Sequence, residues 1–160
     1  MRKAIHASVW GLVLATLIIA GPVTHADHNR AFALIERGDV AGLKAEIAKD
    51  ASVVNSRNEN GMPLLNRAAM TDCVECVRVL VDAGADLRAT DKNFLRTALH
   101  CAAGWSTVEM VRLLVSRGAS LTARSKNGDT ALSFARENFY QDKENERERI
   151  TTFLIKSGAK

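Results

Sequence analysis

The chain has 160 residues, of which 47% are hydrophobic and 25% are charged, with ten glycines and two prolines. This composition excludes collagen-like, low-complexity and intrinsically disordered proteins, and the length favours a single domain. The net charge is +4, but two of these charges come from Arg2 and Lys3 and the other basic residues do not cluster, so we expect no nucleic-acid partner.

Residues 1–26 have the organisation of a secretory signal peptide. The segment begins with two cations, continues with an apolar run of twelve residues at positions 9–20, and ends with the small-x-small sequence THA at positions 24–26. A helix of twelve residues rises only ~18 Å, less than the ~30 Å of a bilayer core, which argues against a retained anchor. We expect cleavage after Ala26, no membrane attachment afterwards and, because no Asn-x-Ser/Thr sequon is present, a bacterial periplasmic location.

Residues 27–57 are expected to form two short amphipathic helices around Gly38 and Asp39. The sequence AFALIERGDVAGLKAEIAKD carries apolar residues at helical spacing on both sides of this pair. A polar outer face suits a segment that ends a stack of repeats. The residues expected on that face are Asn29, Arg30, Glu36, Lys44 and Lys49.

The remainder of the chain repeats itself with a period near 33 residues. Gly84 and Gly118 lie 34 positions apart, and Thr97 and Thr130 lie 33 positions apart. Each unit is predicted to contain a turn, a short helix, a tight connection and a second helix. The three units are residues 58–90, 91–124 and 125–160.

Local signals support this organisation. The hydroxyls of Thr97 and Thr130 can cap the first helix of their units, and Pro63 takes the same place one unit earlier, at a helix start where its missing N–H costs little. Gly84 and Gly118 follow the second helices, at the position of a left-handed cap. No unit can bury its apolar face alone, so the units must stack.

The sequences TALHCAA at positions 97–103 and VRLLVSRGA at positions 111–119 resemble the ankyrin repeat. The resemblance covers nearly all of residues 27–160. It implies an all-α solenoid of about four stacked helix–turn–helix units joined by hairpin loops, with residues 27–57 as the N-terminal capping repeat. It also implies that His100 fixes its turn by hydrogen bonding, and that the stack presents a shallow groove without a water-excluding pocket.

The last unit is seven residues longer than the one before it, around residues 139–148. The spacing from the capping threonine to the final glycine is 21 residues in the earlier unit and 28 in the last. Pairs such as Glu146 and Arg149 at helical spacing favour a solvated extension of the last helix. The alternative is an added contact element that bears Phe139 and Tyr140.

The sequence contains no nucleophile elbow, zinc-protease, phosphate-loop or dinucleotide motif. We therefore expect a non-enzymatic protein without cofactor or metal. The cysteines leave alternatives open. Cys73 and Cys76 form a C-x-x-C at the start of a second helix, and we favour unpaired or passive thiols over a Cys73–Cys76 or Cys76–Cys101 disulfide. A redox or zinc role is the third alternative, and Cys101 by default is a buried small hydrophobe.

Apolar residues outside the repeated pattern indicate a binding surface. Phe94 and Leu95 stand at a turn tip where the other units carry Gly61 and Gly128, the turn is one residue longer there, and Trp105 follows the first helix of the same unit. Surface Trp, Phe and Met side chains are enriched in interfaces. The alternative is that Trp105 packs on the neighbouring repeat and Phe94 lies under the turn. The predicted partner-binding residues are Met62, Met70, Lys92, Phe94, Leu95, Arg96, Trp105, Lys126 and Asp129, the charged ones forming a polar rim.

The resemblance extends to small exported bacterial ankyrin-repeat proteins. These include immunity proteins that neutralise peptidoglycan- or lipid-degrading enzymes, and others that assist periplasmic oxidative-stress enzymes. It therefore implies that this chain, a monomer when free, binds one exported or periplasmic protein. Inhibition of an enzyme is the preferred role, and an accessory or chaperone function, or a thiol redox function of Cys73 and Cys76, is the alternative.

Overall fold

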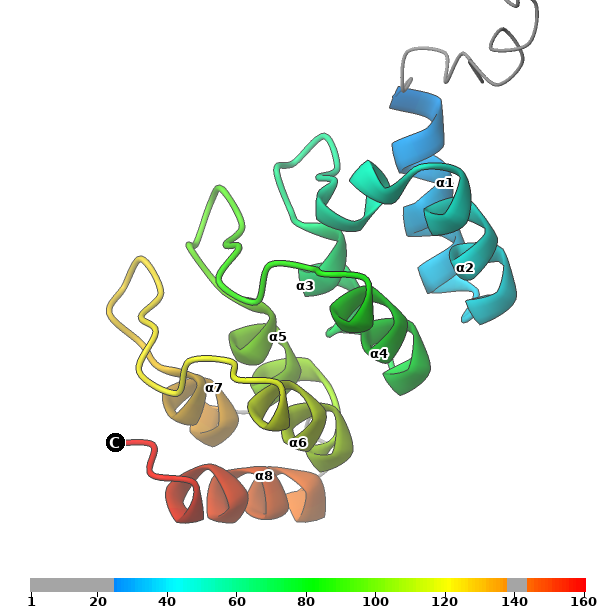
Figure 1. Cartoon of the computed structure of the whole chain (residues 1–160). Helices are drawn as coiled ribbons and strands as arrows, with labels where there is room; N and C mark the ends of the chain where they lie inside the picture. The colour runs from blue at the N-terminus through cyan, green and yellow to red at the C-terminus, as the bar shows by residue number, and fades with distance from the viewer. Residues whose placement is uncertain (1–24, 138–143) are drawn as a thin grey trace, which may run out of the picture.

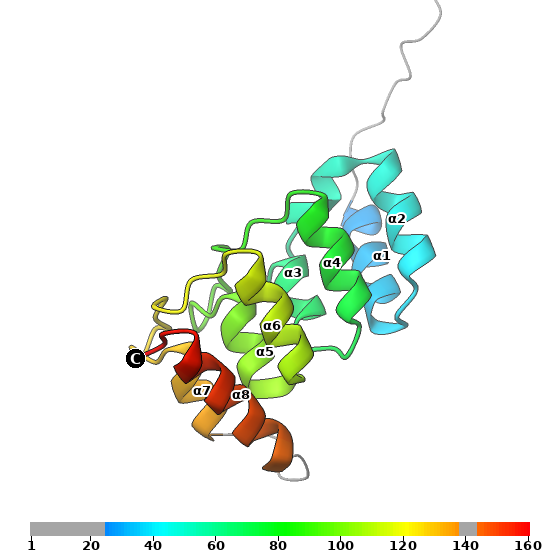
Figure 2. The ribbon, with the colours of Figure 1, turned by 60° about the horizontal axis from the view of Figure 1, so that its bottom comes forward.

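The computed structural model describes residues 25–137 and 144–160, which form four helix pairs stacked in chain order (Figures 1 and 2). The first helices of the pairs are α1 (His25–Glu36), α3 (Leu64–Ala68), α5 (Ala98–Trp105) and α7 (Ala131–Glu137). The second helices are α2 (Val40–Lys49), α4 (Val74–Asp82), α6 (Val108–Ser116) and α8 (Glu144–Lys156). A 3-10 helix, η1 (Ala51–Asn55), follows α2. No strand occurs in the described residues, so the expected all-α stack is confirmed.

The helix ends lie where the sequence predicts them. Pro63 directly precedes α3, and Thr97 precedes α5. Asp39 is the N-cap of α2, and its carboxylate accepts the Gly42 N–H at 2.8 Å. The glycines after the three last second helices are all left-handed, with φ angles of 91°, 89° and 94° at Gly84, Gly118 and Gly158. Each of these glycines thus closely follows the end of a second helix, as expected for a left-handed cap.

The core runs through the whole stack. Between one and three leucines of each helix pair are at most 2% exposed, among them Leu43, Leu80, Leu114 and Leu154. Buried alanines such as Ala102 keep the first helices thin, and α5 packs directly against both α3 and α7. The apolar face of each unit is therefore covered by its neighbours, as stacking requires.

The N-terminal pair is polar outside, but one of its acidic residues is buried. Arg30 and Lys49 are exposed as expected, and both approach Glu46, at 3.2 Å and 3.7 Å. Glu46 itself is only 6% exposed. The predicted signal segment lies outside the described residues except for its last two positions, and the expected cleavage after Ala26 falls in the first turn of α1. No described helix combines the length and apolar character needed to span a bilayer.

The C-terminal pair corrects one expectation. Phe139 and Tyr140 lie outside the described residues, so the alternative that rests on them is not addressed. Glu146 contacts Arg149 as the spacing predicts, but its second carboxylate oxygen accepts the N–H of Val108, at the start of α6, at 2.9 Å. The prediction of a merely solvated extension is therefore wrong for Glu146, because α8 packs against α6.

Candidate functional site: the extended hairpin

The hairpins between consecutive units project from the same side of the stack (Figure 1). In the last unit the Ser125 N–H donates to the Asp129 carbonyl at 2.8 Å, which closes a hairpin of five residues. In the preceding unit the same bond joins Asp91 to Arg96 at 3.0 Å and encloses one residue more. We call residues 91–96 the extended hairpin. The predicted one-residue lengthening is confirmed.

Leu95 has an unusual backbone conformation. Its φ is +53°, and among the described residues it is the one non-glycine with positive φ. Gly61 and Gly128 hold the equivalent positions of the neighbouring hairpins, with φ of 71° and 88°. Left-handed backbone is costly for a residue with a side chain. Leu95 therefore replaces the turn glycine, and Phe94 is the additional residue.

Hydrogen bonds to the Asp91 side chain fix the conformation of the extended hairpin. Its carboxylate accepts the backbone N–H groups of Asn93 at 3.1 Å, Phe94 at 2.7 Å and Arg96 at 3.2 Å. It also accepts the Arg96 guanidinium Nε–H at 2.8 Å, and the residue is 3% exposed. Burial by itself would raise the pKa of Asp91, but the hydrogen bonds from Arg96 and Phe94 outweigh it and the pKa is lowered. Asp91 is therefore ionised, and both of its carboxylate oxygens accept hydrogen bonds.

Arg96 lies at the centre of an aromatic cluster. Its guanidinium carbon is 4.5 Å from the ring centre of Phe94 and 5.1 Å from that of Trp105, distances typical of cation–π contacts. The Arg96 side chain is only 14% exposed. The expectation that Arg96 belongs to a polar rim is wrong, because its bond to Asp91 draws the guanidinium inward.

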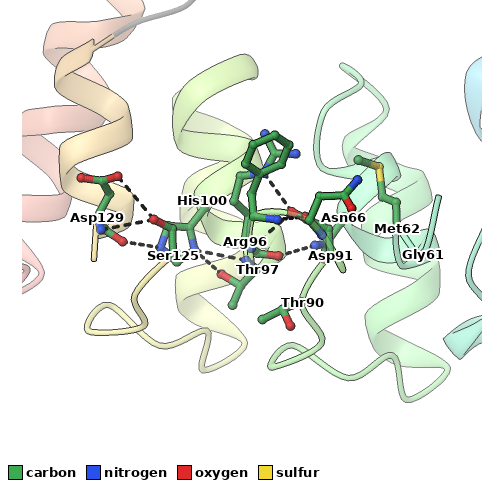
Figure 3. A network of polar contacts seen from close by, with 12 residues as sticks. Gly61, Met62, Asn66, Thr90, Asp91, Arg96, Thr97, His100, Ser125 and Asp129 are labelled. Carbon is green, nitrogen blue, oxygen red and sulfur yellow. Dashed lines mark hydrogen bonds and ion pairs between the residues drawn. The ribbon is translucent and has the colours of Figure 1, made fainter. Parts of the chain in front are cut away.

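A buried polar ladder fixes the hairpins to the helices (Figure 3). The Asn66 amide of α3 donates to the Arg96 carbonyl at 2.6 Å, and His100 Nε2 of α5 lies 3.1 Å from the Asp129 carbonyl. His100 Nδ1 faces the N–H of Thr97 at 3.2 Å, so it accepts there and Nε2 donates. Helices α3 and α5 thus each hold the hairpin of the next unit, and the contacts of His100 confirm its expected role. Sequence reasoning missed Asn66, although it lies three positions after Pro63 as His100 does after Thr97.

The family model of ankyrin repeats, in three copies, matches residues 31–125, more than half of the chain. The chain belongs to the ankyrin-repeat family. A search of curated proteins returned no match to it. Ankyrin repeats are protein–protein interaction modules.

The predicted binding residues of this ankyrin-repeat protein divide into two groups. Phe94 is 52% exposed and Leu95 is 45% exposed, and both lie on the extended hairpin. Trp105 is half-buried, 5.9 Å from the ring of Phe134 in the next unit, and Met70 is likewise packed against the core. The exposed members are Lys92, Phe94, Leu95 and Lys126, and the half-buried members are Met62, Met70, Arg96, Trp105 and Asp129.

The position of Trp105 decides between the two alternatives that the sequence left open for it, exposure on a binding surface and packing on the neighbouring repeat. The alternative that Trp105 packs on the neighbouring repeat is confirmed, since α7 lies against α5 and brings Phe134 to it. Phe94, in contrast, does not lie under the turn, because it contacts Arg96 and stays half-exposed.

The structure joins Cys73 and Cys76 by a disulfide, although unpaired thiols are the preferred prediction. Cys73 is the N-cap of α4 and half-buried, whereas Cys76 is fully buried. Cys101 is a free thiol with no exposed surface, and burial raises its pKa to about 12. It is therefore an inert, buried hydrophobe, as expected. No group of three metal-binding side chains occurs in the part of the chain that the structure describes.

Proposed function

We propose that this ankyrin-repeat protein is an exported, non-enzymatic module that binds one other exported protein through its hairpins and the adjoining first helices. The observation that carries the proposal is the extended hairpin, which holds Phe94 and Leu95 half-exposed in a fixed conformation. A backbone conformation that costs stability is retained where function uses it. Two adjacent apolar side chains at such a point mark a contact surface.

Export is supported by two observations. The first 26 residues have the charge, apolar run and exit sequence of a signal peptide. The Cys73–Cys76 disulfide suits an oxidising compartment such as the periplasm. Intact-mass measurement of the periplasmic protein tests this part of the proposal, with an N-terminus at Asp27 expected. A full-length species in the membrane fraction would contradict it.

Inhibition is the specific role that we propose. The partner would be a peptidoglycan- or lipid-degrading enzyme, and this choice rests on the resemblance to exported immunity proteins. The partner is recovered with the tagged protein from its native periplasm, identified by mass spectrometry and purified. Its enzymatic activity is then measured with and without this protein. A lower enzymatic activity of the partner supports inhibition. An unchanged activity with slower inactivation of the partner supports the accessory or chaperone role.

The binding surface is tested with the same purified partner. We expect Phe94→Ala to weaken binding at least about tenfold, as truncation of an aromatic anchor does, while the melting temperature stays unchanged. Trp105→Ala should lower both the affinity and the melting temperature, because this ring also packs on Phe134. Lys44→Ala, an exposed change in the N-terminal pair, is the control and should alter neither.

A thiol redox function is the alternative that one observation favours. Cys73 is partly exposed at the start of α4 while its partner Cys76 is buried, so a reductant would approach the disulfide from the side of Cys73. Replacing both residues by Ser separates the two roles. Unchanged partner binding with reduced stability indicates a structural disulfide. Loss of function in a folded variant favours the redox role.

A further inference from the structure

We propose that Phe94 and Leu95 form a rigid apolar wedge that enters an apolar recess with an acidic rim on a folded partner. The inference rests on the proposed function and deepens it. It states which part of the surface dominates binding and what chemistry the partner presents. The alternative, an extended peptide lying along the first helices, becomes an outcome of the test.

The wedge is rigid before any partner arrives. The Phe94 N–H donates to the Asp91 carboxylate at 2.7 Å, and the Phe94 carbonyl accepts the Lys126 N–H of the next hairpin at 2.8 Å. The Phe94 ring also stacks on Arg96. Both backbone polar groups of the residue and its ring are therefore held in place. A surface ordered in advance loses little conformational entropy on binding.

The backbone at Leu95 indicates that leucine occupies this position for its side chain and not for the shape of the turn. The same chain builds the neighbouring hairpins with glycine at this point, so a turn without conformational cost is available to it. Leu95 adopts the left-handed conformation with its side chain 45% exposed, where it adds little to the core. Strain of this kind is characteristic of functional positions.

Shape and charge identify the occupant. Two large side chains at the tip of a projecting hairpin form a convex surface, which fits a recess better than it fits an extended peptide. Within residues 91–96 the carboxylate of Asp91 is buried and neutralised by Arg96. Lys92 and the adjacent Lys126 are exposed. The wedge thus has an apolar centre flanked by cations, and its complement is an apolar recess flanked by carboxylates.

Two variants of the full-length protein test the wedge, with the purified partner recovered from the periplasm as the probe. In Leu95→Gly the backbone conformation is relieved and the side chain is lost. In the trimmed variant Phe94 is also deleted, so that the hairpin sequence becomes DKNGR, close to SKNGD at positions 125–129. We expect both to melt no lower than the wild type, Leu95→Gly higher, and to bind at least about tenfold more weakly.

Controls and charge variants complete the experiment. Ile155→Ala removes a side chain of similar exposure, 50%, from the other end of the stack and should leave affinity unchanged. The double variant Lys92→Glu with Lys126→Glu should slow association, most strongly at low salt. Faster association of this variant would contradict the proposal that the partner's recess has an acidic rim.

The outcomes distinguish this inference from the proposed function. Wild-type affinity of the trimmed variant overturns the wedge. If Met62→Ala and Met70→Ala then weaken binding in folded proteins, the binding function stands and the partner lies along the first helices. If the wild-type protein retains no partner, the proposed function and the wedge both fall. A Leu95→Gly variant that melts lower than the wild type would also overturn the wedge, because the conformation would then carry no cost.

Discussion

Single buried polar residues determine how the hairpins are presented. Asp91 organises the extended hairpin from within, whereas Asn66 and His100 hold consecutive hairpins from the helices below. A buried polar group that loses its partner costs more than the bond itself contributes. The hairpin conformation is therefore sensitive to substitutions that leave the apolar core intact.

We predict that His100 makes stability fall as the pH decreases below about 6.5. Burial lowers the pKa of His100, so the unfolded chain binds its proton at higher pH than the folded protein does. Stability therefore rises with pH between the folded pKa and about 6.5. Urea unfolding at about pH 7.5 and about pH 5.5 checks this against His100→Asn, which introduces the residue type of Asn66. The variant should show a smaller difference between the two pH values, and an equal difference would contradict the prediction.

Asp91 is an acid, whereas His100 is a base, but both residues make the stability fall as the pH decreases. Its lowered pKa means that it stabilises the fold above its unfolded pKa of about 3.9, and that this contribution is lost as the pH falls through the lower folded value. We predict that Asp91→Asn costs ~1–3 kcal/mol at neutral pH and less below about pH 4. Trp105, the single tryptophan beyond the predicted cleavage site, stacks on Arg96, so its fluorescence reports the change. A constant difference across pH would argue against a charged Asp91.

At the scale of elements, the helices are short and depend on their ends. Helices α2 to α7 have between 5 and 10 residues, too few to be stable in isolation. Caps and tertiary contacts must therefore supply the stability that helix propensity alone does not provide. Thr107 is the N-cap of α6, and Glu146, 38 positions after Val108, adds a second acceptor at the same end.

We predict that Glu146→Ala lowers the free energy of unfolding by about 1 kcal/mol, the usual contribution of a cap at a helix N-terminus. Glu148→Ala is the matched control, an exposed acidic residue on the same helix, and should stay within ~0.5 kcal/mol. Denaturant unfolding of both variants makes the comparison. Equal effects would mean that Glu146 does not cap α6 in solution.

At the scale of the whole molecule, the stack is a chain of neighbour contacts. The first helices pack on one another along the solenoid, and ion pairs such as Asp82 with Arg117, at 2.6 Å, connect successive units. The buried apolar residues that the structure describes form a single cluster that runs through all four helix pairs. Loss of packing in a central unit should therefore weaken the units on both sides.

We predict that Leu114→Ala costs ~2–5 kcal/mol, because its side chain in α6 is fully buried at the centre of the stack. Ile155→Ala, half-exposed on α8, should cost no more than ~0.5 kcal/mol. Thermal or urea unfolding of the two variants distinguishes them. Similar melting would show that the helix faces are assigned incorrectly.

The sequence alone determined the units, their helix pairs and the glycines that end them. These features are local: apolar residues three and four positions apart build one helix face, and a cap or a left-handed glycine acts within its own turn. The lengthened hairpin followed from the same alignment of units, and the role of His100 followed from the family resemblance.

Only the tertiary structure decided which polar and aromatic side chains are buried. Arg96 and Trp105 were expected at the surface, yet they lie inward because Asp91 and Phe134 meet them there. Glu46 and Glu146 look like exposed charges in sequence, but neighbouring helices supply Arg30 and the N–H of Val108. Arg96 is drawn inward by Asp91 of its own hairpin, but for Trp105, Glu46 and Glu146 the physical reason is the same. The partner that buries the side chain comes from another helix, and the repeat pattern records the apolar face of a helix but not the polar groups that its neighbour brings to it.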